Sequence, residues 1–270
     1  MNARNFDLTL NLEATLLSAL CLLCGQGCGD DFDPKSLVAG YRVLGVQAEP
    51  PETDPDGAVA LTVFDTPPQG EAVRYRWSVC LWSFGPATDY ACVDPALERS
   101  LDGDAATATL DLGPDGLDLR AAYERFGPVP DPNGVPLTLA DGVDVWVILR
   151  SGPADGSGRQ IRTAKRVHVR DGGTPNQNPA MLELTHAGAL EAGGVVTLRA
   201  LLDEDSLEPE DDLLLTWYTS AGEVAPSISF GDDRETELTL PDAPGPIDVF
   251  VAARDSRGGL DVARATLEVR

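Results

Sequence analysis

The chain has 270 residues and a formal net charge of −24, from 44 acidic and 20 basic residues. This length suffices for one large or two medium domains with buried cores. An anionic surface of this size repels phosphate backbones and anionic lipid headgroups, which argues against a nucleic acid partner. The five cysteines and two histidines lack the spacing of a zinc site, so that only a pairing of distant residues would supply one.

An apolar run from Ala14 to Cys24 is the first distinct feature of the chain. It is shorter than the roughly 20 residues that span a bilayer, and it fits the apolar core of a secretory signal peptide. The alternative is a buried helix of a cytoplasmic protein. Against it, the run has no amphipathic period and passes at once into Gly, Gln and acidic residues.

The pair Gly27-Cys28 after this run resembles a bacterial lipobox, whose cysteine is lipidated and becomes the mature N-terminus. The resemblance implies a signal peptide at residues 1–27, lipidation of Cys28 and a tether at residues 28–39. Cys21 and Cys24 fit less well because a leucine precedes each. Gly29 after the cysteine resembles an outer-membrane sorting signal. We therefore expect an exported protein that a lipid anchors at a bacterial outer membrane or cell surface.

Alternating apolar and polar residues predict antiparallel strands with one buried face over residues 40–170. In Ala72–Cys80, the apolar set that includes Trp77 points inward and the set Arg74, Arg76 and Ser78 points outward. The other expected strands are Tyr41–Ala48, Gly57–Phe64, Ala106–Leu112, Gly142–Ser151 and Arg159–Arg170. The basic positions of Arg159–Arg170 indicate either cross-strand pairing with acids, which we favour, or a binding stripe.

An insertion of this first domain covers about residues 81–140 and contains a cysteine loop and a helix. Leu117–Phe126 carries apolar residues at helical spacing, with Asp118 as N-cap and Gly127 as the stop. This pattern predicts a short helix over an open edge or end of the sheets.

Cys80 and Cys92 are expected to form a disulfide, since an exported body meets an oxidising compartment. Cys80 has the opposite parity to Trp77, so the bond would pin Leu81–Ala91 and would not cross the core. Antibody domains differ, because their disulfide joins the two sheets. Redox catalysis is the alternative, but the C-x-x-C spacing is missing.

The strand pattern restarts after a linker at residues 171–179 and predicts a second domain at residues 180–270. Four segments mirror strands of the first domain, namely Gly194–Leu202, Asp212–Thr219, Ile247–Ala253 and Leu260–Val269. We interpret the two domains as diverged copies of one module. In the last strand the apolar parity changes between Val262 and Leu267, which predicts a β-bulge near Ala263–Ala265.

A tryptophan-bearing third strand and the Pro-Gly corner Pro241–Pro246 resemble an immunoglobulin-like sandwich. Val249–Ala253 followed by the turn Arg254–Gly259 resembles the PKD-like group of exported bacterial domains. The predicted fold class is all-β, with two tandem immunoglobulin-like (PKD-like) β-sandwiches after a lipoprotein signal peptide. The combination of an acidic lipoprotein, the loop around Tyr90-Ala91-Cys92 and the turn Arg254–Gly259 is also similar to lipoproteins of GC-rich environmental bacteria. This resemblance implies no activity.

Three aromatic residues inside the cysteine loop, Trp82, Phe84 and Tyr90, form a candidate binding surface. If they are exposed, they could stack on a sugar or anchor a partner protein. If they are buried, they fill the loop, which is the interpretation we favour.

Two further sets of residues are candidates for ligand chemistry. The acidic loop Asp203–Asp212 could hold Ca²⁺ through Asp203, Asp205, Asp211 and Asp212, or it is a solvated hairpin loop. His168 and His186 are expected to be strand residues with a satisfied ring nitrogen.

The sequence contains no recognisable catalytic motif, and we expect no cofactor other than a Ca²⁺ ion. The expected function is a non-enzymatic, membrane-anchored surface or periplasmic lipoprotein that displays its modules for adhesion, spacing or binding of a protein or glycan. The alternatives are an accessory carbohydrate-binding protein and a hydrolase with its site at residues 94–140.

Overall fold

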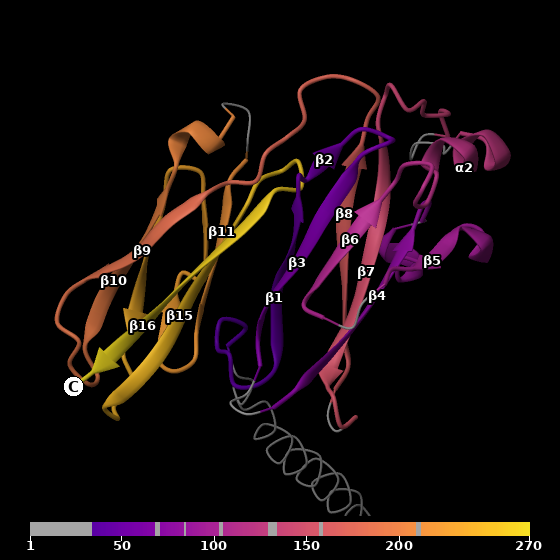
Figure 1. Cartoon of the computed structure of the whole chain (residues 1–270). Coiled ribbons are helices and arrows are strands. Elements are labelled where there is room, and N and C mark those ends of the chain that lie inside the picture. The colour runs from indigo at the N-terminus through magenta and orange to yellow at the C-terminus, as the bar shows by residue number, and fades with distance from the viewer. Residues whose placement is uncertain are drawn as a thin grey trace, which may run out of the picture. The chain divides into compact units, whose positions relative to one another are not determined.

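The computed structural model describes residues 34–67, 71–83, 85–102, 105–128, 134–156, 159–208 and 212–270. The expected signal peptide and residues 28–33 of the expected tether, including Cys28, lie outside these residues. Lys35–Arg270 forms one compact unit, whose strands form four sheets (Figure 1). Among the described residues, no helix has both the length and the apolar character to cross a membrane.

The first pair of sheets is formed by residues 42–169. The smaller sheet has the order β1 (Arg42–Glu49), β3 (Ala58–Thr66), β6 (Thr107–Asp111). The larger has the order β2 (Glu52–Thr53), β8 (Ile161–Val169), β7 (Val143–Pro153), β4 (Val73–Cys80), β5 (Glu98–Ser100). Neighbouring strands are antiparallel except β2, which runs parallel to β8. The short helices η2 (Pro86–Thr88), η3 (Pro95–Leu97) and α2 (Leu119–Phe126) lie between strands of this pair.

The second pair of sheets is formed by residues 181–269. One sheet has the order β12 (Glu223–Ala225), β14 (Glu235–Thr239), β10 (Val195–Leu202), β9 (Met181–Ala187). The other has the order β13 (Ile228–Phe230), β11 (Leu214–Thr219), β15 (Gly245–Arg254), β16 (Leu260–Val269). The single-turn helix η4 (Glu204–Ser206) follows β10.

This strand order is that of an immunoglobulin-like sandwich. In the second sandwich β9, β10, β14 and β12 occupy the A, B, E and D positions, and β11, β15 and β16 occupy C, F and G. In the first sandwich β1, β3 and β6 correspond to A, B and E, and β4, β7 and β8 to C, F and G. The expected all-β fold of two tandem immunoglobulin-like sandwiches is confirmed.

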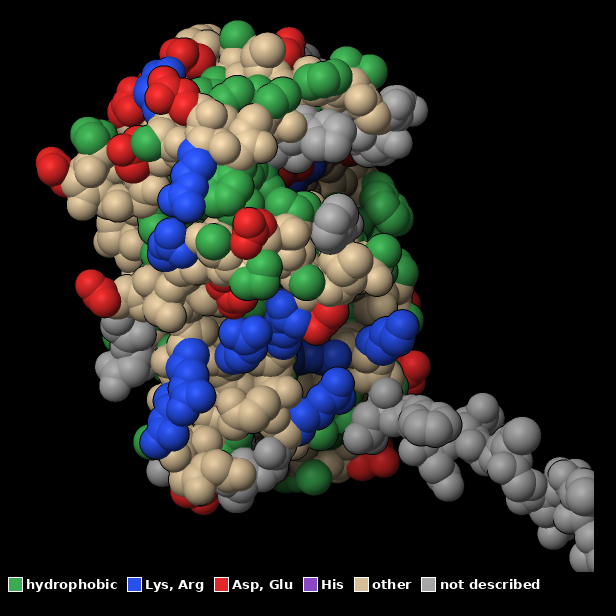
Figure 2. Space-filling view, turned by 90° about the vertical axis from the view of Figure 1, so that its right-hand side faces the viewer, with side chains coloured by type: hydrophobic (Ala, Val, Ile, Leu, Met, Phe, Trp, Pro, Cys, Tyr) green, Lys and Arg blue, Asp and Glu red, His purple; other side chains and the backbone are tan. Residues whose placement is uncertain are grey.

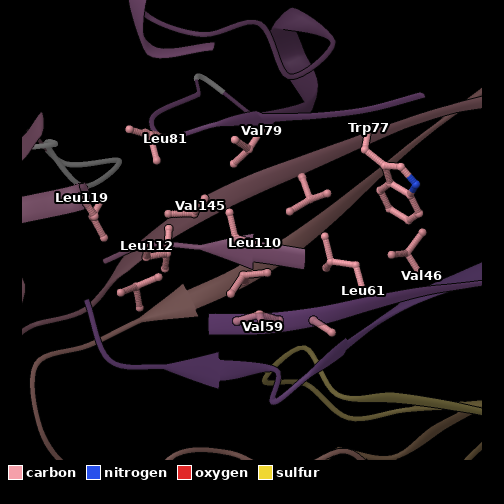
Figure 3. Close-up of a cluster of buried hydrophobic side chains, with 14 of the residues drawn as sticks. Val46, Val59, Leu61, Trp77, Val79, Leu81, Leu110, Leu112, Leu119 and Val145 are labelled. Atoms are coloured by element: carbon pink, nitrogen blue, oxygen red, sulfur yellow. The ribbon is translucent and has the colours of Figure 1, made fainter. Parts of the chain in front are cut away.

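Each sandwich has a tryptophan of its C strand in the core, as the alternating pattern predicted. Trp77 is 3% exposed and Trp217 is fully buried. In the first core, apolar side chains from the two facing sheets point toward one another, and Leu119 of α2 covers one end (Figure 3). Each Å² of apolar surface that is buried stabilises the fold by about 25 cal/mol. The alternation of apolar and polar residues therefore determines which face of each strand points into the core.

The helix α2 begins and ends where its sequence signals predicted. The Asp118 carboxylate accepts a hydrogen bond from the Ala121 N–H at 3.0 Å, and Gly127 ends the helix with φ 84°. A positive φ favours glycine because it has no side chain to clash with the backbone.

The expected β-bulge in the last strand is absent, and this prediction was wrong. β16 pairs with β15 without a break in register from Leu260 to Val269. Leu260 is only 3% exposed, but it belongs to neither core cluster. A Cβ atom added at Gly45 of β1 would lie 2.5 Å from Leu260 Cδ2. Leu260 therefore points away from the core of its own sandwich and is buried against the first sandwich.

The turn between β15 and β16 is hydrogen-bonded to the first sandwich. Gln47 Nε2 donates to the Leu260 carbonyl at 2.9 Å, and Lys165 Nζ donates to the Gly258 carbonyl. Asp255 shapes the turn by accepting from the N–H groups of Arg257 and Gly259. We call residues 254–260 the junction turn.

The segment expected to be a linker, residues 171–179, contributes buried groups to this contact. Asn176 is 2% exposed, and its side chain donates to Asp255 at 2.9 Å. Asn178 donates to the Ala48 carbonyl at 2.8 Å and accepts from the Leu260 N–H at 2.9 Å. The segment connects the sandwiches and also bonds to both of them.

The last residues of the expected tether also contact the second sandwich. Ser36 is 4% exposed, and its carbonyl accepts from the Thr219 N–H at 2.9 Å. The Val38 N–H donates to the Thr219 carbonyl at 2.8 Å, which forms a short parallel bridge to β11. The chain is therefore held at the second sandwich before it enters β1.

Candidate functional site

The disulfide Cys80–Cys92 closes the loop that follows β4, with the two Cα atoms 5.5 Å apart. Ser83 and Cys92 form an isolated β-bridge at its base. Cys80 is opposite Trp146 of β7, on the outer face of the larger sheet. The disulfide thus pins the loop on that face and does not cross the core, as predicted.

Trp82 does not belong to the candidate binding surface. It is 3% exposed, and its ring packs edge-on against Tyr123 at 6.0 Å and Phe126 at 6.1 Å between centroids. Both partners belong to α2, so the inserted helix covers this ring. Phe84 lies outside the described residues.

Tyr90 is the member of the aromatic set that lies on the sheet face. It is half-buried, and its ring packs at 4.8 Å against the half-buried ring of Trp146. The neighbouring Asp89 forms an ion pair with Arg162 of β8. The loop therefore spans β7, and Ile148 of that strand is only 2% exposed although it belongs to neither core.

The outer face beyond this loop is basic. Register places Arg76 of β4 opposite Arg150 of β7, and Arg150 opposite Arg162 of β8. We call these three residues the arginine row. Arg74 lies on the same face one repeat along β4. Arg74, Arg76 and Arg150 are exposed.

The sequence predicted the outward direction of Arg74 and Arg76 but not the row. The residues of the row are 74 and 12 positions apart along the chain. The alternation of side chains along a strand places each of them on the outer face. Only the pairing register of the three strands brings them side by side. Arg162 has an arginine as its cross-strand neighbour, whereas Arg166 and Arg170 of the same strand segment pair with the acids Asp144 and Glu52, as we expected for Arg159–Arg170.

A cavity of about 730 Å³ adjoins the row at its β8 end. Its lining includes Arg42, Arg159, Arg162 and Tyr41. The hydroxyl groups of Tyr41 and Tyr75 both donate to Asp65, at 3.1 and 2.8 Å. Burial, and then the nearby Asp65, raises the pKa of both phenols above the ordinary value, so they remain donors at neutral pH.

The acidic residues proposed for Ca²⁺ are only partly described. Asp203 caps η4 by accepting from the Asp205 N–H, while Asp211 lies outside the described residues. Asp212 is exposed. In the described part of the chain, no group of three or more His, Cys, Asp or Glu side chains has the arrangement of a metal site. Ca²⁺ binding stays a prediction.

The two histidines differ in their surroundings. His168 of β8 has its Nδ1 atom 2.9 Å from Asp144 Oδ1 of β7, which satisfies one ring nitrogen as expected. His186 of β9 is exposed. The two residues lie on different sandwiches.

A cavity of about 610 Å³ borders the region that we considered for a hydrolase. Its carboxylates are Asp102 and Asp111, beside β3 and β6. Asp111 Oδ1 accepts from the Gly113 N–H at 2.9 Å, which makes Asp111 part of the turn that leads to α2.

Comparisons with known proteins return similar folds at low identity. No protein-family model matches the chain, and no curated protein matches it. Fibronectin(III)-like modules of Clostridium thermocellum CbhA match at 12% identity over 85% of this chain and 94% of that chain, with a TM-score of 0.30. The two tandem V-type regions of VCBP3, a v-region-containing chitin binding protein, match at 14% over 84% and 100%, with a TM-score of 0.34. The D0-D1 domain of intimin matches at 14% over 84% and 98%, with a TM-score of 0.23. At these scores the assignment of the fold rests on the strand order of the two sandwiches.

Proposed function

We propose that this chain is a non-enzymatic, lipid-anchored bacterial protein that displays two immunoglobulin-like sandwiches as one unit at the outer membrane or cell surface. The junction turn is the observation that carries this proposal. Its carbonyl groups accept from Gln47 and Lys165 of the first sandwich, and its Asp255 accepts from Asn176. Such buried, paired polar groups specify one arrangement of the two modules.

Two features support export of the chain. The disulfide Cys80–Cys92 suits an oxidising compartment, because cytosolic thiols are kept reduced. The apolar run before Gly27-Cys28 has the order of parts of a lipoprotein leader. The multiple acyl chains of a bacterial lipoprotein would hold the protein firmly on a membrane.

The anchor is tested by expressing the full chain and its Cys28→Ser variant in a two-membrane bacterium. We expect the parent chain in the membrane fraction, with an N-terminal peptide that carries a lipid mass on Cys28. The Cys28→Ser variant loses this mass and the membrane retention of the mature form. A matched Cys24→Ser variant keeps both. Recovery of the parent chain from the cytosol with an unmodified amino end would refute the proposal.

A further inference from the structure

The two sandwiches differ at the edge of their smaller or first sheet. In the described part of the chain, β6 of the first sandwich pairs with β3 and with no other strand. The equivalent strand of the second sandwich, β14, pairs with β10 on one side and with β12 on the other. The first sandwich therefore lacks the strand at the D position that β12 forms in the second.

The cysteine loop explains why no strand of the chain takes this position. In the second sandwich β12 comes from residues 220–227, between β11 and β13. The corresponding segment of the first sandwich is residues 81–97, between β4 and β5. The disulfide Cys80–Cys92 and the packing of Tyr90 on Trp146 hold this segment on the outer face of the larger sheet. The segment therefore does not pair with β6.

The backbone groups of Thr107 and Thr109 point away from β3. The Val63 N–H donates to the Ala106 carbonyl at 2.9 Å, so Ala106 faces β3. Because hydrogen-bonded residues alternate along an antiparallel strand, the even-numbered residues of β6 bond to β3 and the odd-numbered ones face the other way. Thr107 and Thr109 are exposed, and their N–H and C=O groups have no hydrogen-bond partner within the described ranges. We call these two residues the open edge.

Other groups of the protein satisfy the backbone at both ends of the open edge. At one end Trp77 Nε1 donates to the Ala105 carbonyl at 2.9 Å. At the other end the Leu117 N–H donates to the Asp111 carbonyl at 2.9 Å. The open edge is thus a bounded site of two residues. Edge strands are commonly protected by lysine, proline or a bulge, and β6 has none of these.

The strand β12 shows what fits an edge of this length. In its pairing with β14, Glu223 lies opposite Thr239 and Ala225 lies opposite Glu237. Val224 between them is 4% exposed and belongs to the core of the second sandwich. A strand of three residues therefore pairs with two residues of the edge and buries its middle side chain.

The cavity of about 610 Å³ adjoins the open edge, and both of its threonines line the cavity. Leu101 and Leu117 also line it and are packed against the first core. The charged residues of the lining are Asp102 and Asp111, with no basic residue among those that line it. Lys and Arg side chains gather elsewhere, for example in the lower half of the face in Figure 2. The cavity thus offers an apolar surface and negative charge.

We propose that the open edge binds an extended segment of a partner protein, which pairs antiparallel with β6 in the place that β12 takes on β14. The backbone of the segment satisfies the N–H and C=O groups of the open edge, as in strand addition to the edges of other sheets. Leu101 and Leu117 select an apolar residue in its middle. Asp102 and Asp111 select lysine or arginine beside it. The proposal does not depend on the lipid anchor, so either can fail without the other.

Electrostatics favours such a partner over a second copy of this chain. Each copy has a net charge of −24. Pairing of two β6 strands would bring Asp111 of both copies into one groove beside Asp102. The same charges attract a basic segment.

The test uses the full chain in neutral detergent and the synthetic peptide KTVKVTK with blocked ends, whose two valines share one face. We expect binding that weakens as salt is added. Amide hydrogen exchange of Thr107 and Thr109 should be slower when the peptide is bound. An analogue with N-methylated backbone amides keeps the side chains and the charge but lacks the donors, and it should not bind.

The variant Thr109→Pro removes one outward N–H and keeps the bonds to β3, because an edge strand accepts proline where its N–H faces away from the sheet. It should bind the peptide at least about tenfold more weakly, a difference of about 1.4 kcal/mol. The matched control is His186→Pro in the edge strand β9, where the N–H also faces away from the neighbouring strand, and it should bind as the parent does. If Thr109→Pro does not fold, Asp102→Asn supplies the test and should bind about threefold more weakly, as expected for one exposed charge pair.

Four results would overturn the proposal. The first is that the peptide does not bind the parent chain at low salt, or binds without slowing exchange at Thr107 and Thr109. The second is that the N-methylated analogue binds as tightly as the peptide. The third is that His186→Pro weakens binding as much as Thr109→Pro, or that Asp102→Asn binds as the parent does. The fourth is that the free chain sediments as a dimer with slow exchange at both threonines, which would assign the open edge to a second copy.

Discussion

Replacement of Lys165 by methionine should change how the stability of the protein depends on pH. Lys165 is 9% exposed, and its ammonium group donates to the Gly258 carbonyl of the junction turn. Burial lowers its pKa from 10.5 to about 8, which Asp255 partly opposes and Arg166 and Arg254 reinforce. The side chain is therefore charged at neutral pH at a cost to folding.

The direction of the effect follows from the two pKa values. Between about pH 8 and 10.5 the folded protein releases the proton while the unfolded chain keeps it, so the free energy of unfolding rises with pH. Each pKa unit is worth 1.36 kcal/mol, which gives about 3 kcal/mol over the whole window and about 2 kcal/mol between pH 7 and 9.5. The raised pKa values of Tyr41 and Tyr75 act with the opposite sign, but only above about pH 10.

The assay is thermal unfolding of the parent chain and Lys165→Met at pH 7 and pH 9.5. At about 2–4 °C per kcal/mol for domains of this size, the parent should gain several degrees relative to the variant as the pH rises. Methionine has a similar length and no charge, so the variant lacks this contribution. Parallel pH profiles for the two proteins would show that the reasoning about Lys165 is wrong.

Three other predictions concern stability. Reduction of Cys80–Cys92, which closes a loop with a separation of 12 residues, should lower the free energy of unfolding by about 3 kcal/mol; a urea midpoint that reductant leaves unchanged would contradict this. The Asp255→Ala change removes the acceptor of the Asn176 side chain and of two turn N–H groups, so limited proteolysis should cut within residues 171–179 faster than in the parent; equal rates would count against the role of the junction turn. Asp118→Ala should cost about 1 kcal/mol through loss of the α2 N-cap, measured by urea unfolding.

The strands and the helix could be predicted because their signals are local. Alternation around Trp77 and Trp217 fixed the buried face of each C strand, and Asp118 with Gly127 bounded α2. The parity of Cys80 relative to Trp77 placed the disulfide outside the core. Each of these inferences uses residues that lie within about a dozen positions of one another. The pairing of Cys80 with Cys92 itself was inferred from their spacing and from the expected export, which rests on the distant leader.

Features that depend on distant partners could not be predicted in this way. Leu260 is buried by β1 of the other sandwich, so its parity in β16 suggested a bulge that does not exist. Asn176 lies in a Gly- and Pro-rich segment typical of linkers, but it is buried because Asp255, 79 positions away, accepts its amide. Burial of Trp82 agrees with the interpretation we favoured, but the sequence did not indicate that a helix beginning at Leu119 covers it. None of these contacts produces a periodic pattern of apolar and polar residues in the sequence.

The junction turn has a consequence for how such modules can be inherited. Immunoglobulin-like repeats that are joined only by their linkers can be recombined one at a time, because the surface of each repeat needs no contact with its neighbour. Here a recombination event that separated the sandwiches would leave Leu260 uncovered on one product, and Gln47 and Lys165 without their carbonyl acceptors on the other. The two modules should therefore be exchanged among genomes as a pair.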